Sequence, residues 1–132
     1  MLDALFKPQH LASLQILKVE IGGDADSTEG SESSHEHVAG EVNCARGYEF
    51  WLAAQAKLRN PAIRLYGLPW GWPSYLGGAN HSAPLAPWNA EATTSYVADW
   101  VECAAESYDL TIDFIGRHFQ SFDLLKFPLV FG

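Results

Sequence analysis

The chain has 132 residues and a formal net charge of −8, with 8 basic against 16 acidic side chains. Because no cluster of Lys and Arg offsets this charge locally, the composition argues against nucleic-acid binding. Hydrophobic residues make up 48% and charged residues 18% of the chain, which indicates a folded domain. No apolar run approaches the roughly 20 residues of a membrane-spanning helix, and the first residues lack the pattern of a signal peptide.

Short apolar segments predict strands at residues 14–21, 62–68 and 110–115. Two segments with apolar residues at helical spacing lie between them, at 44–59 and 90–108. This alternation implies parallel strands joined by right-handed crossovers. A closed (β/α)8 barrel needs about 250 residues. We therefore predict an α/β fold that is a partial TIM barrel, with about three parallel strands and two covering helices.

Apolar spacing also predicts which face of each helix is buried. The residues expected on the buried face of the first helix are Tyr48, Trp51, Leu52, Ala56 and Leu58. Those expected on the buried face of the second are Tyr96, Val97, Trp100, Val101 and Ala104. Asn60 and Pro61 are expected to end the first helix, and Asn89 to cap the second.

Long loops follow the first two predicted strands, at residues 22–43 and 69–89, whereas the connections at the opposite ends are short. Parallel α/β folds bind their ligands at the carboxyl ends of the strands, so we expect a site on these loops. The acidic and histidine residues of the first loop fit neither the Ca²⁺-loop pattern nor the HExxH motif. We expect a solvated acidic loop that binds no metal.

The two cysteines, Cys44 and Cys103, form neither a metal-binding nor a redox motif. Two buried or partly buried thiols in helices are the favoured interpretation, and a disulfide is the alternative that their spacing does not decide. Asn80 begins an Asn-His-Ser sequon, which is glycosylated only on the secretory route.

Four further side chains are candidates for chemistry. Trp70 and Trp72 follow the second strand, where an aromatic ring serves equally well as a platform for a sugar or as a cap on the core. Glu20 ends the first strand and is either a catalytic carboxylate or an ion-pair partner of the neighbouring loops. Asp113, inside the third strand, is expected to have a structural role.

Four collinear stretches resemble glycoside hydrolase family 59. They are LFKP at 5–8, ASLQILKVEIGGDADSTEG at 12–30, RGYEFWLAAQAKLRNPAIRLYGLPWGWPSYLG at 46–77 and YDLTIDFIG at 108–116. The resemblance implies a lysosomal retaining (β/α)8 enzyme that removes galactose from galactosylceramide and psychosine, with a saposin presenting the lipid. Thr28 and Trp70 match family positions that contact the galactose. No cofactor or metal is implied.

The resemblance ends before the catalytic residues. In the family the fourth strand continues into Ile-Trp-Asn-Glu, whose Glu is the general acid/base, whereas this chain continues with Arg117-His118-Phe119-Gln120. The nucleophilic Glu belongs to a later strand. We predict a barrel fragment over 1–116 and a divergent apolar tail over 117–132, without catalytic residues and inactive alone. The alternatives are a weak galactose-binding module and a purely structural βαβαβ fragment.

Overall fold

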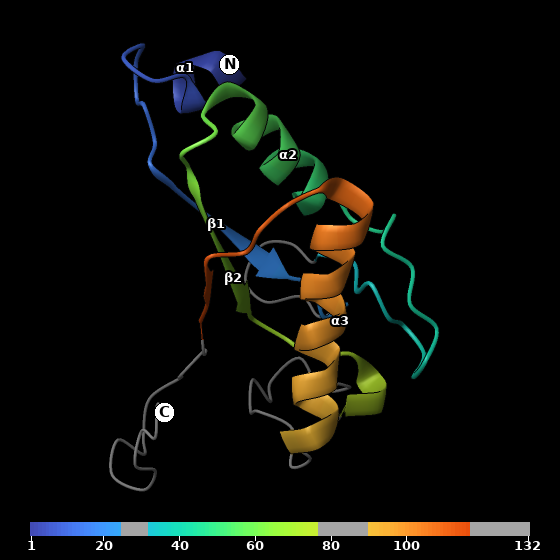
Figure 1. Ribbon diagram of the computed structural model, residues 1–132. Coiled ribbons are helices and arrows are strands. Elements are labelled where there is room, and N and C mark those ends of the chain that lie inside the picture. The colour runs from blue at the N-terminus through green and yellow to red at the C-terminus, as the bar shows by residue number, and fades with distance from the viewer. Residues whose placement is uncertain (25–31, 77–89, 117–132) are drawn as a thin grey trace, which may run out of the picture.

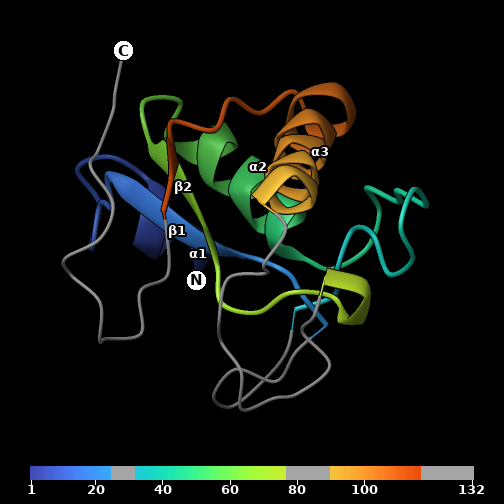
Figure 2. The same ribbon diagram turned by 90° about the horizontal axis from the view of Figure 1, so that it is seen from below.

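The computed structural model describes residues 1–24, 32–76 and 90–116. Within these ranges the strands β1 (Ile16–Ile21), β2 (Arg64–Pro69) and β3 (Phe114–Ile115) form one parallel sheet in the order β1-β2-β3. The helices are α1 (Leu2–Phe6), α2 (Glu49–Arg59) and α3 (Ala90–Tyr108), with a 3-10 turn, η1 (Ser74–Leu76). Figures 1 and 2 show α2 and α3 together on one face of the sheet. The predicted order of parallel strands and covering helices is confirmed.

The third strand is shorter than predicted. Pairing of β2 with β3 joins only Tyr66 to Phe114 and Gly67 to Ile115. Just before β3, a carboxylate oxygen of Asp113 accepts the Leu65 N–H at 2.8 Å, while the Asp113 N–H donates to the Leu65 carbonyl at 2.9 Å. Because the Asp113 carboxylate accepts the Leu65 N–H, regular pairing between β2 and β3 begins one residue later, at Phe114. The geometry agrees with the structural role expected for Asp113.

The core lies between the sheet and the two long helices. Its buried apolar members include Val19, Ile21, Leu65, Phe50, Ala53, Ala56, Tyr96, Trp100 and Ala104. Gly67 of β2 makes close packing of α3 feasible, because a Cβ at this position would lie 2.8 Å from the Trp100 ring. For α3 the predicted buried face is confirmed, with Val97 and Val101 partly buried at its margin.

The predicted buried face of α2 is partly wrong: Ala56 is buried and Leu52 partly buried, as predicted, but the other three predicted residues are exposed. Tyr48 is 62%, Trp51 54% and Leu58 75% exposed, whereas Phe50 points inward. The ring of Phe50 lies 5.1 Å from that of Trp100 and stacks 5.0 Å from that of Tyr108. Contact with α3 therefore decides which side of α2 is buried, and the larger aromatics Tyr48 and Trp51 remain at the surface.

The end of α2 agrees with the sequence, because Asn60 is its C-cap and donates its backbone N–H to the Ala56 carbonyl. The side chain of Asn60 also donates to the Leu14 carbonyl at 3.1 Å. Asn89, the predicted cap of α3, lies outside the described residues.

The segment before α2 is not helical, contrary to the prediction that the helix begins at residue 44. Cys44 and Cys103 form a disulfide with their Cα atoms 5.2 Å apart, so the expectation of two free thiols is wrong as well. Gly47 follows with a φ of 75°, which is incompatible with a right-handed helix. The helix starts after this turn because the chain must first reach α3 at the disulfide.

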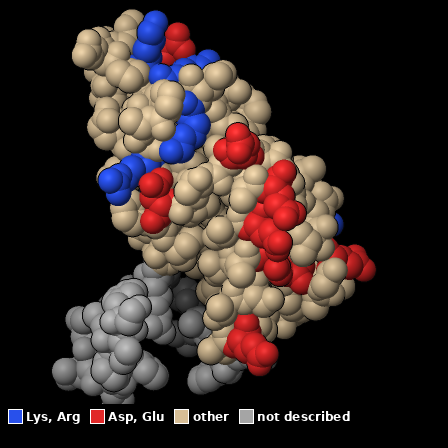
Figure 3. Space-filling view, in the orientation of Figure 1, with Lys and Arg blue, Asp and Glu red and all other residues tan. Residues whose placement is uncertain are grey.

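Charge is distributed unevenly over the surface (Figure 3). Acidic side chains gather over α3, whose sequence contains Glu91, Asp99, Glu102 and Glu106 and no basic residue. Of the helices described, none has the length and apolar character required to cross a bilayer.

Candidate functional site

The loops that follow β1 and β2 meet at the carboxyl edge of the sheet. Gly22 and Gly23 leave β1 and are both buried. A Cβ on Gly23 would lie 2.3 Å from the carbonyl oxygen of Gly71, so the two loop backbones are in direct contact. This meeting of the loops is the arrangement expected from parallel strands.

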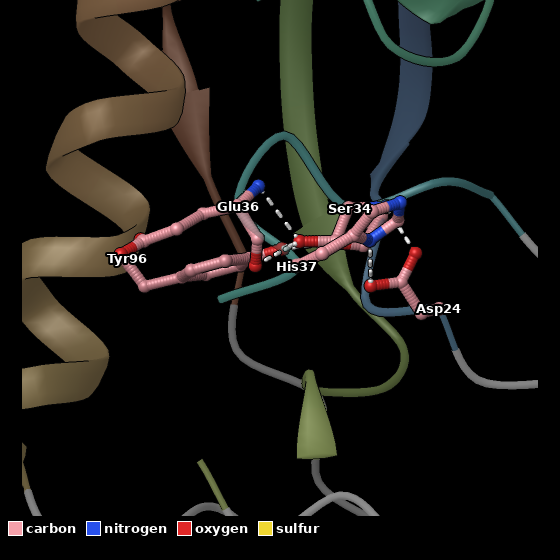
Figure 4. A network of polar contacts seen from close by, with 6 residues as sticks. Asp24, Ser34, Glu36, His37 and Tyr96 are labelled. Carbon is pink, nitrogen blue, oxygen red and sulfur yellow. Dashed lines mark hydrogen bonds and ion pairs between the residues drawn. The ribbon is translucent and has the colours of Figure 1, made fainter. Parts of the chain in front are cut away.

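Asp24 closes the first loop at its base (Figure 4). Its backbone N–H donates to the Glu32 carbonyl at 3.2 Å, and its Oδ1 accepts the Ser34 N–H at 2.8 Å. Its Oδ2 lies 2.6 Å from Nδ1 of His37. A single aspartate therefore holds residues 32, 34 and 37 against the end of β1. Asp24 has a left-handed φ of 57°, which aspartate tolerates better than most residues.

Tyr96 of α3 connects the helix to the same loop. Its hydroxyl donates to the Gly22 carbonyl and is hydrogen-bonded to Ser34 Oγ at 2.8 Å. Its backbone carbonyl accepts a hydrogen bond of 3.0 Å from His35 Nε2, and its ring lies 4.2 Å from the imidazole of His35. Burial raises the pKa of Tyr96, so the phenol remains a donor. The ring also contacts Trp72 edge-on at 5.9 Å.

A short stretch of the first loop, residues 34–36, is buried, whereas residues 37–43 are exposed, so the expectation of a fully solvated loop is corrected for this stretch. Ser34, His35 and Glu36 are between 0% and 6% exposed, as is Glu32. Burial lowers the pKa of His35, so its imidazole is neutral near neutral pH. The Nε2–H donates to the Tyr96 carbonyl, since a carbonyl only accepts, and Nδ1 is consequently an acceptor.

Three carboxyl groups gather where this loop meets the start of α2. Glu32 Oε1 accepts the Tyr48 N–H at 3.0 Å, satisfying a backbone donor at the helix N-terminus. Glu49 Oε1 accepts the Glu20 N–H at 3.0 Å. Burial, reinforced by the charge of Glu32, raises the pKa of Glu20 to about 7 and that of Glu49 to about 8. Burial also raises the pKa of Glu32.

The two tryptophans of the second loop have different surroundings. Trp72 is partly buried against the core and contacts Tyr96. Trp70 is half-buried, and the ammonium of Lys18 lies 5.5 Å from the centroid of its ring. Because Val19 and Leu65 face the helices, the alternation along the strands places Lys18 and Trp70 on the opposite face. Trp70 thus lies on the face of the sheet opposite α2 and α3, and Trp72 is the ring that packs against the core.

Two of the predicted site residues, Thr28 and Asn80, lie outside the described residues. The sequence pattern did not predict the roles of Tyr96 and Asp24. Tyr96 was expected only as a core aromatic, and Asp24 only as one acid in an acidic loop. The Gly-Gly-Asp sequence directly after a strand is the signal that points to a tight loop base.

Within the described ranges, no group of three or more His, Cys, Asp or Glu side chains is arranged to hold a metal ion. The carboxylates instead satisfy backbone donors, as Glu32, Glu49 and Asp24 do. The site is therefore a set of loops held by polar contacts, beside an aromatic ring at the carboxyl edge of the sheet.

The fold resembles part of a glycosidase barrel. A solved endo-β1,6-glucanase superposes with a TM-score of 0.60 at 16% sequence identity, over 86% of this chain and 28% of that one. At this identity the likeness shows the fold alone, and it agrees with the predicted partial TIM barrel.

The sequence model of glycosyl hydrolase family 59 matches residues 1–123, and the chain belongs to this family. Galactocerebrosidase from Salmo salar is 47% identical over 134 aligned residues, which cover 97% of this chain and 20% of that protein. Galactocerebrosidase from Homo sapiens is 51% identical over 115 residues, covering 87% of this chain and 16% of that protein. The chain therefore spans a fifth or less of the length of these relatives.

Proposed function

We propose that the chain is the part of a galactosylceramide β-galactosidase that helps to bind the sugar and contributes no catalytic carboxylate. The single observation that carries the proposal is the position of Trp70. Its half-buried ring follows β2 at the carboxyl edge of the sheet, on the face opposite α2 and α3. Sugars present apolar C–H faces to such rings. The 47–51% identity to galactocerebrosidases supports galactose as the sugar.

Lys18 adds to this arrangement. Its ammonium stands over the Trp70 ring at a distance typical of a cation–π contact. The ammonium offers hydrogen-bond donors to hydroxyl groups of a bound sugar. Thr28, on the neighbouring loop, is proposed to contact the galactose through its hydroxyl.

The binding test is a titration of the chain with galactose, followed by tryptophan fluorescence. We expect weak binding, with a dissociation constant on the order of 1 mM or higher, which corresponds to a binding free energy of about −4 kcal/mol or weaker. Trp70→Ala should abolish the response and Thr28→Val should weaken it. Trp51→Ala is the matched control, because Trp51 is 54% exposed on α2. The proposal is contradicted if the fluorescence response to galactose falls equally in Trp70→Ala and Trp51→Ala, or if Trp70→Ala keeps the full response.

The second part of the proposal is that the chain alone does not hydrolyse galactosides. A retaining enzyme needs two carboxyl groups about 5–5.5 Å apart, one as acid/base and one as nucleophile. Glu32 and Glu49 hold backbone N–H groups, and Asp113 holds that of Leu65. Glu20 remains the candidate to exclude. We expect no galactose release from a chromogenic β-galactoside; release that is lost in Glu20→Gln would overturn this part.

We further propose a lysosomal setting, with the lipid presented by a saposin-type protein to the complete enzyme. The Cys44–Cys103 disulfide supports passage through an oxidising compartment, since disulfides rarely persist in the cytosol. Glycosylation of Asn80 gives a direct test. When the chain is routed through the secretory pathway, treatment with an N-glycosidase should increase its mobility, and Asn80→Gln should remove this shift. If the treated and untreated chains have the same mobility, Asn80 is not glycosylated.

A further inference from the structure

A small cavity lies between the first loop and the start of α2, away from Trp70. Its lining includes side chains from the loop, from the turn before α2 and from both long helices: Glu32, His35, Arg46, Glu49, Phe50 and Trp100. The space open to the centre of a water-sized sphere is about 10 Å³. By this measure the cavity has room for about one water molecule.

Three polar atoms of these lining residues are buried without a hydrogen-bond partner in the protein: His35 Nδ1, Arg46 Nη1 and Glu49 Oε2. A buried donor or acceptor left without a partner destabilises the folded chain. His35 itself is 2% exposed, so bulk solvent does not reach its imidazole. The cavity is thus surrounded by groups that require a partner.

The chemical roles of the three atoms are known from their other contacts. His35 donates from Nε2 to the Tyr96 carbonyl, which leaves Nδ1 as an acceptor. Glu49 Oε1 accepts the Glu20 N–H, so the proton that the carboxyl retains at neutral pH, with its pKa raised to about 8 by burial, sits on Oε2 and makes it a donor. Arg46 Nη1 is a donor because a guanidinium has no lone pair to offer. The site therefore presents one acceptor and two donors.

We propose that one internal water molecule binds in this cavity, donates a hydrogen bond to His35 Nδ1, and accepts hydrogen bonds from Arg46 Nη1 and Glu49 Oε2. A water has two protons and two lone pairs, so this set uses one proton and both lone pairs. The guanidinium of Arg46 opposes a cation at this place, and the carboxyl of Glu32 opposes an anion. A neutral ligand of the size of water is the species that meets both conditions.

The water would link three neighbouring segments of the chain. His35 belongs to the buried stretch 34–36 of the first loop, Arg46 to the turn before α2, and Glu49 to the first turn of that helix. Together with Glu32, which accepts the Tyr48 N–H, it fixes the loop on the helix N-terminus. The role is that of a structural bridge, and it does not depend on galactose binding.

A crystal structure of the full chain at a resolution that shows ordered water tests the proposal. We expect one peak within about 2.7–3.2 Å of all three atoms. Crystals grown in RbBr distinguish ions by their anomalous signal. An anomalous peak at this position overturns the assignment to water. So does direct bonding of Arg46 to Glu49 with no peak between them.

A solution measurement uses nuclear Overhauser transfer from long-lived water to protons of the His35 ring. The wild-type chain should show the transfer, and Arg46→Met should reduce it several-fold and lower the midpoint of thermal unfolding. Arg64→Met is the matched control, because Arg64 is an exposed arginine of β2 outside the cavity lining. Transfer that is absent in the wild type overturns the proposal, as does a loss of equal size in the control.

Discussion

The hydroxyl of Tyr96, on α3, donates a hydrogen bond to the backbone carbonyl of Gly22, 74 positions earlier in the chain. Gly22 is the first residue after β1, so this contact attaches α3 to the carboxyl edge of the sheet. The neighbouring Gly23 touches Gly71 of the second loop. One phenol on the helix thereby positions the point at which both loops meet.

Tyr96→Phe removes this hydroxyl and keeps the ring. The Gly22 carbonyl and Ser34 Oγ both lose a buried partner, so we expect the free energy of unfolding to fall by about 1–3 kcal/mol. Thermal or urea denaturation measures the loss. Tyr48→Phe is the control, because Tyr48 is 62% exposed and its substitution should change stability little. Equal midpoints for the wild type and Tyr96→Phe would show that the contact contributes nothing.

Gly23→Ala places a methyl group 2.3 Å from the Gly71 carbonyl oxygen. Neither backbone can move without disturbing the other, so we expect both lower stability and a loss of the tryptophan response to galactose. Gly40→Asn is the control, since open space surrounds Gly40 and asparagine tolerates its φ of 82°. Galactose binding that survives in Gly23→Ala would mean that the contact between the loops does not position Trp70.

The Cys44–Cys103 disulfide should contribute substantially to stability. It closes a loop over a sequence separation of 59. In the chain-entropy model such a cross-link stabilises the folded chain by about 4 kcal/mol, and strain in the native state or residual structure in the unfolded state lowers this value. We expect Cys44→Ala with Cys103→Ala to lower the unfolding midpoint markedly. The native chain should also resist a thiol reagent until it is reduced. Immediate labelling of both cysteines in the unreduced chain would contradict the disulfide.

Stability should decrease as the pH rises from about 4.5 to about 8. Burial raises the pKa of Glu20 to about 7 and that of Glu49 to about 8, so the folded chain holds protons that the unfolded chain releases near its ordinary carboxyl pKa of 4.5. The folded state therefore binds more protons throughout this window, and its free energy of unfolding falls with increasing pH. The slope for one fully retained proton is at most about 1.4 kcal/mol per pH unit.

Glu49→Gln provides the matched variant for the pH measurement. Glutamine keeps an oxygen that can accept the Glu20 N–H, and it does not titrate. The decrease in unfolding midpoint between pH 4.5 and 8 should therefore be smaller in this variant than in the wild type. A decrease of the same size in both chains would assign the pH dependence to other groups.

Much of the architecture follows from local patterns in the sequence. β-branched segments predicted all three strands, and the helical spacing of Tyr96, Trp100 and Ala104 predicted the inward face of α3. The Asn60-Pro61 pair predicted the end of α2, because the residue before a proline disfavours the helical conformation. Alternation of strands and helices predicted parallel pairing, and with it the edge at which the two loops meet. These features depend on residues close together in the chain.

The sequence by itself therefore determined the α/β class, the parallel order, the family resemblance and the position of Trp70 at the end of a strand. Only the tertiary structure decided that Phe50 rather than Trp51 turns inward, that Cys44 pairs with Cys103, and that Glu32 and His35 are buried. The physical reason is distance along the chain. A local pattern reports the periodicity of its own segment, whereas packing, disulfide pairing and the burial of a polar side chain depend on which distant segment lies against it.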